Sequence, residues 1–177
     1  MPPYATNSIM TDYRSNIKIG SLNCRSNSKL PNPTTSSEFT RLLRNPDLKN
    51  DLLCLQETHA IDSVRERLNM QFQTINSIWT THCGIVCLNL HISIQLLNID
   101  LDDRIITCRL THTSSLFSPI TLVNIYAPAT ASSRARFFSQ LLSLPLLQPE
   151  SWALDTSTIT FNIPLPPGSA DEEPTAV

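Results

Sequence analysis

Three apolar stretches of the chain each end in one polar side chain. The first alternates between apolar and polar positions, and the second is a continuous apolar run typical of a buried strand. The strands are predicted over 17–22, 52–56 and 120–125, and the polar residues after them are Asn23, Glu57 and Tyr126. A single such residue is commonly an ordinary solvated strand end. Three together, one per strand, are typical of a site assembled at the edge of a sheet.

Two short helices are expected between and after the first two strands. Thr35 and Glu38 form a capping box ahead of apolar residues spaced as one helical face, and Pro46 ends this helix. Ser63 and Glu66 repeat the capping pattern after the second strand. Both segments therefore predict helices that can cover one face of a sheet.

A third helix is predicted over 131–144, where aromatic and leucine side chains form one apolar face and Pro145 ends the pattern. Arg134 and Arg136 lie on its first turn, shortly after Tyr126. Arginines at such places are usually plain surface residues. Because of their nearness to Tyr126, contact with a phosphate backbone is the alternative.

Three further strands follow one another closely in the middle of the chain. They are predicted over 82–88, 92–99 and 104–110, with no room for helices between them, so an antiparallel meander is expected. The turn before the last of them holds Asp100, Asp102 and Asp103. This turn lacks the glycine and the spaced oxygen ligands of an EF-hand, which favours a solvated turn over a calcium site.

The five cysteines do not indicate a disulfide framework. Four of them lie in or beside apolar strands, where cysteine behaves as a small buried hydrophobe. Cys83, Cys87 and His91 have a spacing that would suit zinc on a helix. The surrounding residues favour a strand, along which four residues cover roughly 13 Å, too far for the ligands of one zinc ion.

Composition permits nucleic acid as a partner without requiring it. Hydrophobic residues make up 41% and charged residues 16% of the 177 residues, which is typical of one globular domain. The net charge is −2, but residues 1–149 carry thirteen bases against ten acids, and the remainder carries five acids and no base. No signal peptide or membrane-spanning run is expected, so we predict an intracellular protein, nuclear or cytoplasmic, that is not secreted and has no membrane partner.

The three strand ends carry motifs that resemble a known superfamily. Asn23, the segment Leu55-Gln56-Glu57-Thr58 and the segment Asn124-Ile125-Tyr126-Ala127-Pro128 are similar, in order and spacing, to motifs of the endonuclease/exonuclease/phosphatase superfamily. This superfamily includes the exonuclease III-type nucleases. Extended to Cys54–His59 and Val123–Pro128, the motifs resemble most closely the endonuclease domain of LINE-type retrotransposons.

The resemblance implies an α/β fold in which two mixed sheets form a sandwich flanked by helices. It covers only the front part of the superfamily's fold, so the second sheet is expected to be incomplete. The implied organisation is a flexible segment over 1–16, a partial domain over 17–163, and a disordered, acidic, proline-rich tail over 164–177.

The resemblance also implies chemistry for the predicted site. Glu57, with Asn23, would hold Mg²⁺ or Mn²⁺ for phosphodiester hydrolysis, and no small-molecule cofactor is expected. The catalytic residues would be Asn23, Tyr126, which would hydrogen-bond the phosphate, and Asn162, which would orient the attacking water. The superfamily's Gly-Asp-x-Asn motif has Thr160 in place of its aspartate here, and the closing Asp-His pair has no counterpart in the sequence.

Two functions of different class follow from these residues. One is a metal-dependent endonuclease domain of retrotransposon type that acts on DNA, impaired by truncation. The other is a catalytically inactive remnant that at most binds nucleic acid, which the altered motif around Thr160 favours. A phosphatase acting on small phosphoesters is a third hypothesis. The extension of the motif to His59 favours a nuclease over it.

Overall fold

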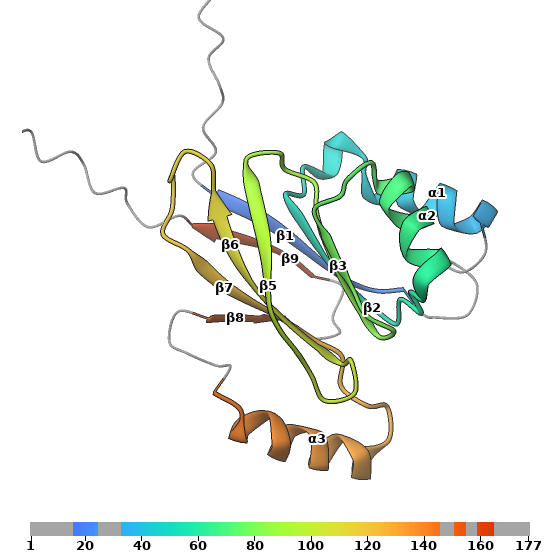
Figure 1. Cartoon of the computed structure of the whole chain (residues 1–177), viewed down its shortest axis with the longest axis vertical. Helices are drawn as coiled ribbons and strands as arrows, with labels where there is room; N and C mark the ends of the chain where they lie inside the picture. The colour runs from blue at the N-terminus through green and yellow to red at the C-terminus, as the bar shows by residue number, and fades with distance from the viewer. Residues whose placement is uncertain (1–15, 25–32, 146–150, 155–158, 165–177) are drawn as a thin grey trace, which may run out of the picture.

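The structure is a computed structural model that describes residues 16–24, 33–145, 151–154 and 159–164. The predicted flexible segment and acidic tail, apart from Asn16 and Pro164, lie outside these residues. The described part of the chain forms two β-sheets and three α-helices (Figure 1). Within it, none of the helices has the length and apolar character needed to cross a bilayer.

The first sheet has the strand order β3-β4-β2-β1-β9, and the second has the order β5-β6-β7-β8. The strands of the first sheet are β1 (Asn16–Asn23), β2 (Leu52–Gln56), β3 (Ser77–Trp79), β4 (Cys83–Cys87) and β9 (Ile159–Pro164). Those of the second are β5 (Ile92–Asp100), β6 (Ile105–His112), β7 (Ile120–Ile125) and β8 (Ser151–Leu154). Only β1 with β2 and β7 with β8 pair in parallel among these strands, so both sheets are mixed, as predicted.

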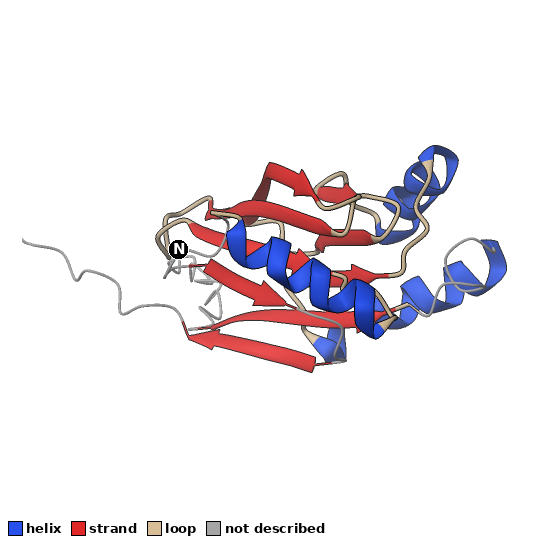
Figure 2. Cartoon of the chain, turned by 90° about the horizontal axis from the view of Figure 1, so that it is seen from below, coloured by secondary structure: helices blue, strands red, loops and turns tan. Residues whose placement is uncertain are grey.

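Helices cover the outer face of each sheet (Figures 1 and 2). The helices are α1 (Pro33–Leu43), α2 (Asp62–Phe72) and α3 (Ala131–Ser143), with a short 3₁₀ turn, η1, over Pro46–Leu48. One apolar cluster lies between the two sheets, a second between the first sheet and helices α1 and α2, and a third between the second sheet and α3. The fold is thus a four-layered sandwich, and the predicted α/β two-sheet class is confirmed.

Strand β2 shows why its sequence reads as a continuous apolar run. Leu52 and Cys54 point into the cluster between the sheets, and Leu53 and Leu55 point into the cluster under the helices. Because successive side chains of a strand point to opposite faces, a strand covered on both faces must be apolar throughout. All five of its residues are buried, which brings Glu57 to the rim of a rigid element.

The five cysteines are all buried, and no disulfide joins any two of them. Burial raises the pKa of the Cys87 thiol to about 11 and that of Cys108 to about 12. Thiols in such surroundings stay protonated and unreactive at neutral pH. Cys87 and Cys108 therefore act as small apolar side chains between the sheets.

Three local predictions were wrong. Helix α1 begins at Pro33, so Thr35 lies inside it, and a proline suits the first helical position because it lacks the N–H that would stay unpaired there. Helix α2 begins at Asp62 and has Ile61 at its N-cap, with no side-chain cap. Strand β4 pairs with β2 and β3 in the first sheet, so the antiparallel meander consists of β5, β6 and β7.

Gly84 on β4 is a position where a side chain cannot fit. A Cβ added there would lie 2.5 Å from two ring carbons of Trp79, its cross-strand partner. Gly84→Ala is expected to lower the free energy of unfolding by about 1–3 kcal/mol, because the indole must move within a packed core. Urea denaturation measures this cost. Gly20→Ala is the control, since its nearest neighbour is the mobile end of Leu53, and an equal loss there would contradict the proposed clash.

Candidate active site

Glu57 stands on a sharp bend directly after β2. Its φ of 53° is in the left-handed region, as is the φ of 47° at His59, and side chains other than glycine adopt this region at a cost of about 1–3 kcal/mol. Strain of this kind persists only where the surrounding structure holds it, and it is concentrated at functional sites. The bend turns the Glu57 carboxylate out of the buried run, leaving it half-buried.

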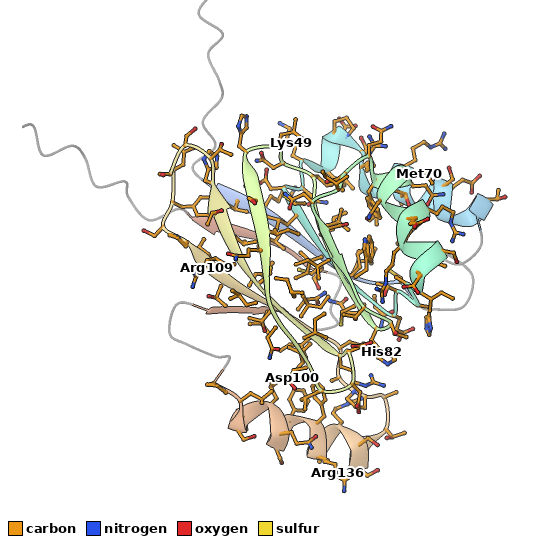
Figure 3. All side chains as sticks on the ribbon, in the orientation of Figure 1. Lys49, Met70, His82, Asp100, Arg109 and Arg136 are labelled. Carbon is orange, nitrogen blue, oxygen red and sulfur yellow. The ribbon has the colours of Figure 1, made fainter. Side chains whose placement is uncertain are left out.

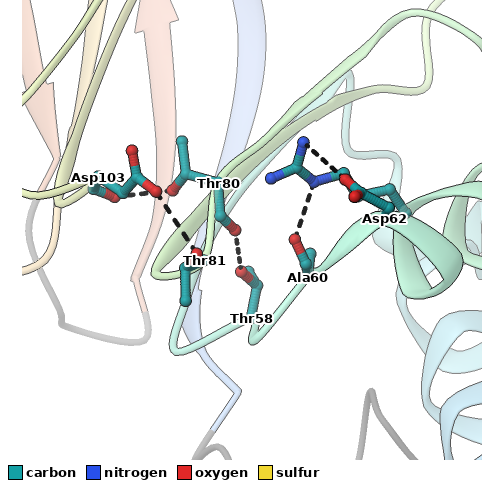
Figure 4. A network of polar contacts seen from close by, with 7 residues as sticks. Thr58, Ala60, Asp62, Thr80, Thr81 and Asp103 are labelled. Atoms are coloured by element: carbon teal, nitrogen blue, oxygen red, sulfur yellow. Dashed lines mark hydrogen bonds and ion pairs between the residues drawn. The ribbon is translucent and has the colours of Figure 1, made fainter.

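Hydrogen bonds from a neighbouring turn hold this bend. The backbone N–H groups of Thr58 and His59 donate to the carbonyl oxygens of His82 (3.4 Å) and Thr81 (2.9 Å). The Thr58 hydroxyl donates to the carbonyl of Thr80 at 3.0 Å (Figure 4). The Thr80 hydroxyl in turn donates to the carbonyl of Asp103, at 2.7 Å, in the turn between β5 and β6. Three loops are therefore joined around the bend.

The three predicted strand-end residues meet at one carboxylate oxygen. The Asn23 amide nitrogen donates to Glu57 Oε1 at 3.0 Å, and the Tyr126 hydroxyl donates to the same oxygen at 2.9 Å. Asn23 is the last residue of β1 and Glu57 follows β2, its parallel neighbour in the first sheet, while Tyr126 follows β7 of the second. The cluster therefore lies where the ends of strands from both sheets come together.

Two buried amides, which were not identified from the sequence, link the sheets beneath this cluster. The Gln56 amide nitrogen donates to Asn124 Oδ1 at 2.8 Å and to the Ser21 hydroxyl at 3.3 Å. Asn124 donates to the carbonyl oxygens of Leu55 (3.1 Å) and Gly84 (2.9 Å). Gln56 and Asn124 are fully buried. We call these two side chains the amide bridge. Their signal in the sequence was a lone polar residue inside each apolar run.

The phenol ring of Tyr126 has a charged and a titratable neighbour. The Arg104 guanidinium carbon is 5.1 Å from the ring centroid, and the His82 ring lies 5.8 Å away. Burial, followed by the hydrogen bond and the charge of Glu57, raises the pKa of Tyr126, and Arg104 opposes this shift. Burial, followed by the charges of Arg104 and His59, lowers the pKa of His82, against Asp103 and Asp102. At neutral pH Tyr126 is a hydrogen-bond donor and His82 is uncharged.

Glu57→Gln is expected to lower the pKa of Tyr126 toward its ordinary value of about 10, because the phenolate would no longer face a carboxylate. In the native protein the raised pKa adds stability below about pH 10, which is lost as the pH rises through the pKa of the folded state. Ultraviolet titration of tyrosinate measures this pKa after Tyr4 and Tyr13 are replaced by phenylalanine. An unchanged pKa in Glu57→Gln would contradict the observed contact.

Asn162 is not brought to this cluster by the described backbone. Strand β9 runs antiparallel to β1 and pairs Asn162 with Lys18, five residues before Asn23. At about 3.3 Å per residue, the two asparagines lie roughly 16 Å apart along the sheet. The role of Asn162 in orienting water stays a prediction.

The other candidate residues have separate surroundings. The Arg134 guanidinium donates to the carbonyl oxygens of Pro128 (3.1 Å) and Ala129 (2.8 Å), so it stabilises the loop before α3. Cys83 and Cys87 lie on strand β4, which is the strand conformation in which their spacing is too long for a shared zinc site. Among the described residues, no group of three histidine, cysteine or acidic side chains is placed to hold a metal ion.

The arrangement of the two sheets and their helices is one that known proteins share. The chain has the fold of the endonuclease/exonuclease/phosphatase superfamily, as predicted. It is similar to humanized TDP2 from D. rerio, with 15% identity and a TM-score of 0.52, over 80% of this chain and 61% of the other. It is also similar to the endonuclease domain of TRAS1, a telomere-specific non-LTR retrotransposon, with 10% identity and a TM-score of 0.55, over 79% and 59% of the two chains.

A third similar structure is D. rerio TDP2 complexed with a single-strand DNA product, with 12% identity and a TM-score of 0.51, over 80% of this chain and 60% of the other. The chain thus spans about three fifths of the length of these solved structures. No protein-family model and no curated protein sequence matches it. At these identities the similarity establishes the fold, and the activity must be argued from the residues.

Proposed function

We propose that the chain is part of a divalent-metal-dependent nuclease domain of retrotransposon type that hydrolyses phosphodiester bonds of DNA. The observation that carries this proposal is the meeting of Asn23, Glu57 and Tyr126 at one carboxylate oxygen. The structurally similar proteins are DNA-processing enzymes, which supports the nuclease class. Each of the three residues ends or directly follows a strand, so the cluster is held by rigid elements of both sheets.

The chemistry of the cluster fits Mg²⁺ or Mn²⁺. These hard cations take oxygen ligands, and Mg²⁺ is commonly held by one or two carboxylates together with phosphates of the substrate. Glu57 provides a carboxylate. Asn23, whose amide nitrogen donates to Glu57, has an amide oxygen, which is a second oxygen of suitable type. When bound, the metal would polarise a phosphoryl oxygen and neutralise charge that develops on it.

The chain's own residues would hold and orient the substrate. The hydrogen bond from Asn23 fixes the orientation of the Glu57 carboxylate. The Tyr126 hydroxyl, protonated at neutral pH, is a donor suited to a phosphate oxygen next to Glu57. Arg104 packs against the Tyr126 ring and adds a positive charge near the Tyr126 hydroxyl.

Nicking of supercoiled plasmid by the purified, folded chain in Mg²⁺ tests this function. We expect nicked circles to accumulate in Mg²⁺, no nicking in a parallel reaction that contains a chelator, and nicking again when excess Mg²⁺ is added to that reaction. Circular dichroism of the same sample shows whether the protein is folded. Folded protein that leaves the plasmid intact in Mg²⁺ and in Mn²⁺ would overturn the nuclease proposal.

An inactive protein that binds nucleic acid is the second candidate. This candidate is favoured by the pairing of Asn162 with Lys18, because that register places Asn162 away from Asn23 and the cluster at Glu57. In that case the hydrogen-bonded cluster at Glu57 would be retained in the fold, but it would not catalyse hydrolysis. Retention of a labelled oligonucleotide without cleavage distinguishes this candidate from the first.

A further inference from the structure

Two histidine rings lie against each other at the end of the second sheet opposite to Tyr126. His112 is the last residue of β6, and His91 comes directly before β5, whose first residue, Ile92, pairs with His112. The ring centroids are 5.8 Å apart and the planes are tilted by 24°, so the rings are stacked. The length of β7, at about 3.3 Å per residue, places this pair roughly 20 Å from the candidate active site.

The two histidines hold the loop that joins β6 to β7, residues 113–119. The His112 ring nitrogen Nδ1 accepts a hydrogen bond from the Ser114 N–H at 3.0 Å. His91 holds the same loop through its carbonyl oxygen, which accepts from the Thr113 N–H at 2.8 Å. The beginning of the loop is therefore bound to both strands that carry or adjoin the stacked rings.

This loop places an aromatic side chain in the core. Phe117 is only 6% exposed and belongs to the apolar cluster between the two sheets. Its ring meets the His112 ring edge-on, with the centroids 5.6 Å apart. Ser115 has a φ of 52°, in the left-handed region that side chains other than glycine adopt at a cost, so the closed loop is strained. Release of the loop would relieve this strain and expose Phe117.

The hydrogen bond from Ser114 fixes the form of the His112 ring. A neutral imidazole has one N–H and one lone pair, so the Nδ1 that accepts from Ser114 is unprotonated and the proton lies on Nε2. Neither nitrogen of this ring then offers a lone pair to a metal, although two neighbouring imidazoles are a common ligand pair. A protonated ring carries N–H on both nitrogens and cannot accept from Ser114. The closed loop therefore requires an uncharged His112.

The strands and the loop around the rings supply no counter-charge. The loop over 113–119 contains no charged side chain. Arg109 on β6 is exposed and, three residues before His112, points to the opposite face of the strand. Asp100 ends β5 at the other end from His91 (Figure 3). None of the described acids of these elements is therefore placed to stabilise a charged His112.

The connection from β4 to β5 brings one acid toward His91. The Asp51 carboxylate accepts from the Asn89 amide at 2.8 Å, and Asn89 Oδ1 accepts from the His91 N–H at 2.8 Å. Burial, followed by the charge of His91, nevertheless lowers the pKa of His112. Attraction between a charged His112 ring and the Phe117 ring opposes this shift only in part, because the pKa is lowered on balance.

We propose that His91 and His112 form a pH-sensitive latch, which holds the loop over 113–119 closed at neutral pH and releases it when His112 takes up a proton. The open loop would withdraw Phe117 from the apolar cluster between the sheets. Since the pKa of His112 is lower in the closed state than its ordinary value of about 6.5, the closed state is favoured above this pH and is progressively lost below it. The latch is independent of the proposed nuclease function, because it includes none of its residues.

Hydrogen exchange followed by mass spectrometry, on the native chain at about pH 7.5 and about pH 5.5, tests the latch. After correction for the intrinsic pH dependence of exchange, protection of the segment over 113–119 should fall by up to about tenfold at the lower pH. The reason is that one pH unit below about 6.5 favours the protonated, open form by about a factor of ten. Protection of strand β6 should not change. Unchanged protection of the loop, or an equal loss in β6, would overturn the proposal.

His112→Asn separates the hydrogen bond from the titration. The asparagine side-chain oxygen can accept from the Ser114 N–H as Nδ1 does, in the manner of an Asx turn, but it takes up no proton in this pH range. Loop protection in this variant should be the same at both pH values. His59→Asn is the matched control, since asparagine tolerates the φ of 47° there, and it should keep the native pH dependence. A pH dependence that survives in His112→Asn would show that another group opens the loop, and the latch would be wrong.

Titration of the imidazole signals by NMR gives a second test, which does not depend on loop opening. His112 in the native chain should titrate below about pH 6.5, and His91→Gln should raise the pKa of His112, because the neighbouring charge is removed. The same variant should reduce the difference in loop protection between the two pH values, since the closed and open states then differ less in proton affinity. An ordinary pKa for His112, or one that His91→Gln leaves unchanged, would overturn the assignment of the pair.

Discussion

Glu57→Gln is expected to reduce Mg²⁺-dependent nicking by roughly 100- to 1000-fold. The substitution keeps the size of the side chain and one acceptor oxygen, but it removes the charge that would hold the cation. Loss of metal-stabilised charge is worth several kcal/mol in the transition state, and each 1.4 kcal/mol is about a factor of ten in rate. Initial rates of plasmid nicking over a series of Mg²⁺ concentrations measure the effect.

Glu66→Gln is the matched control for this experiment. Glu66 lies exposed on α2, so the same chemical change there should leave the nicking rate within about twofold of the native rate. If Glu57→Gln also kept the native rate at saturating Mg²⁺, the catalytic metal would have to be bound by other residues. The role proposed here for the strand-end cluster would then be wrong.

Asn124→Leu is expected to lower the free energy of unfolding by about 3 kcal/mol or more. Leucine has a similar size but cannot replace the hydrogen bonds to the carbonyl oxygens of Leu55 and Gly84, or accept the bond from Gln56. Each buried polar group left without a partner costs about 1–3 kcal/mol, and these costs are only partly additive. Thermal or urea denaturation followed by circular dichroism measures the loss.

Two further variants show whether the loss comes from the amide bridge. Asn98→Leu makes the same change at an exposed position on β5 and should cost less than about 0.5 kcal/mol. The double variant Gln56→Leu/Asn124→Leu should be destabilised by less than the sum of the single variants, since each removes a partner of the other. Strict additivity would mean that the two amides do not stabilise the structure as a pair.

The sequence predicted the strand ends well because a local rule governs them. A strand buried on both faces must be apolar, so the residue at which the apolar run ends marks the rim of the sheet. This is why Asn23, Glu57 and Tyr126 could be grouped before any coordinates were known. In the structure they meet at one oxygen of Glu57, and their catalytic and metal-binding roles stay predictions.

The choice of sheet for β4 could not be predicted in the same way. Its partners, β2 and β3, are selected by which apolar faces match in the finished sandwich, and the short connection to β5 contains no sign of the change of sheet. The amide bridge was missed for a related reason. A polar residue within an apolar run reads as a local irregularity until the opposite sheet supplies its partner, as Asn124 does for Gln56.

Glu57 and Tyr126 adjoin strands of different sheets, so the hydrogen bond between them forms only when the two sheets are packed in a fixed arrangement. A molten globule of this chain would retain its helices and strands, and hence its far-ultraviolet circular dichroism, while the two sheets lost their fixed register. The bond from Tyr126 to Glu57 would already be broken in such a state, and the pKa of Tyr126 would be close to that of a free tyrosine. The ionisation of one phenol would thus report the loss of ordered packing before any loss of secondary structure could be detected.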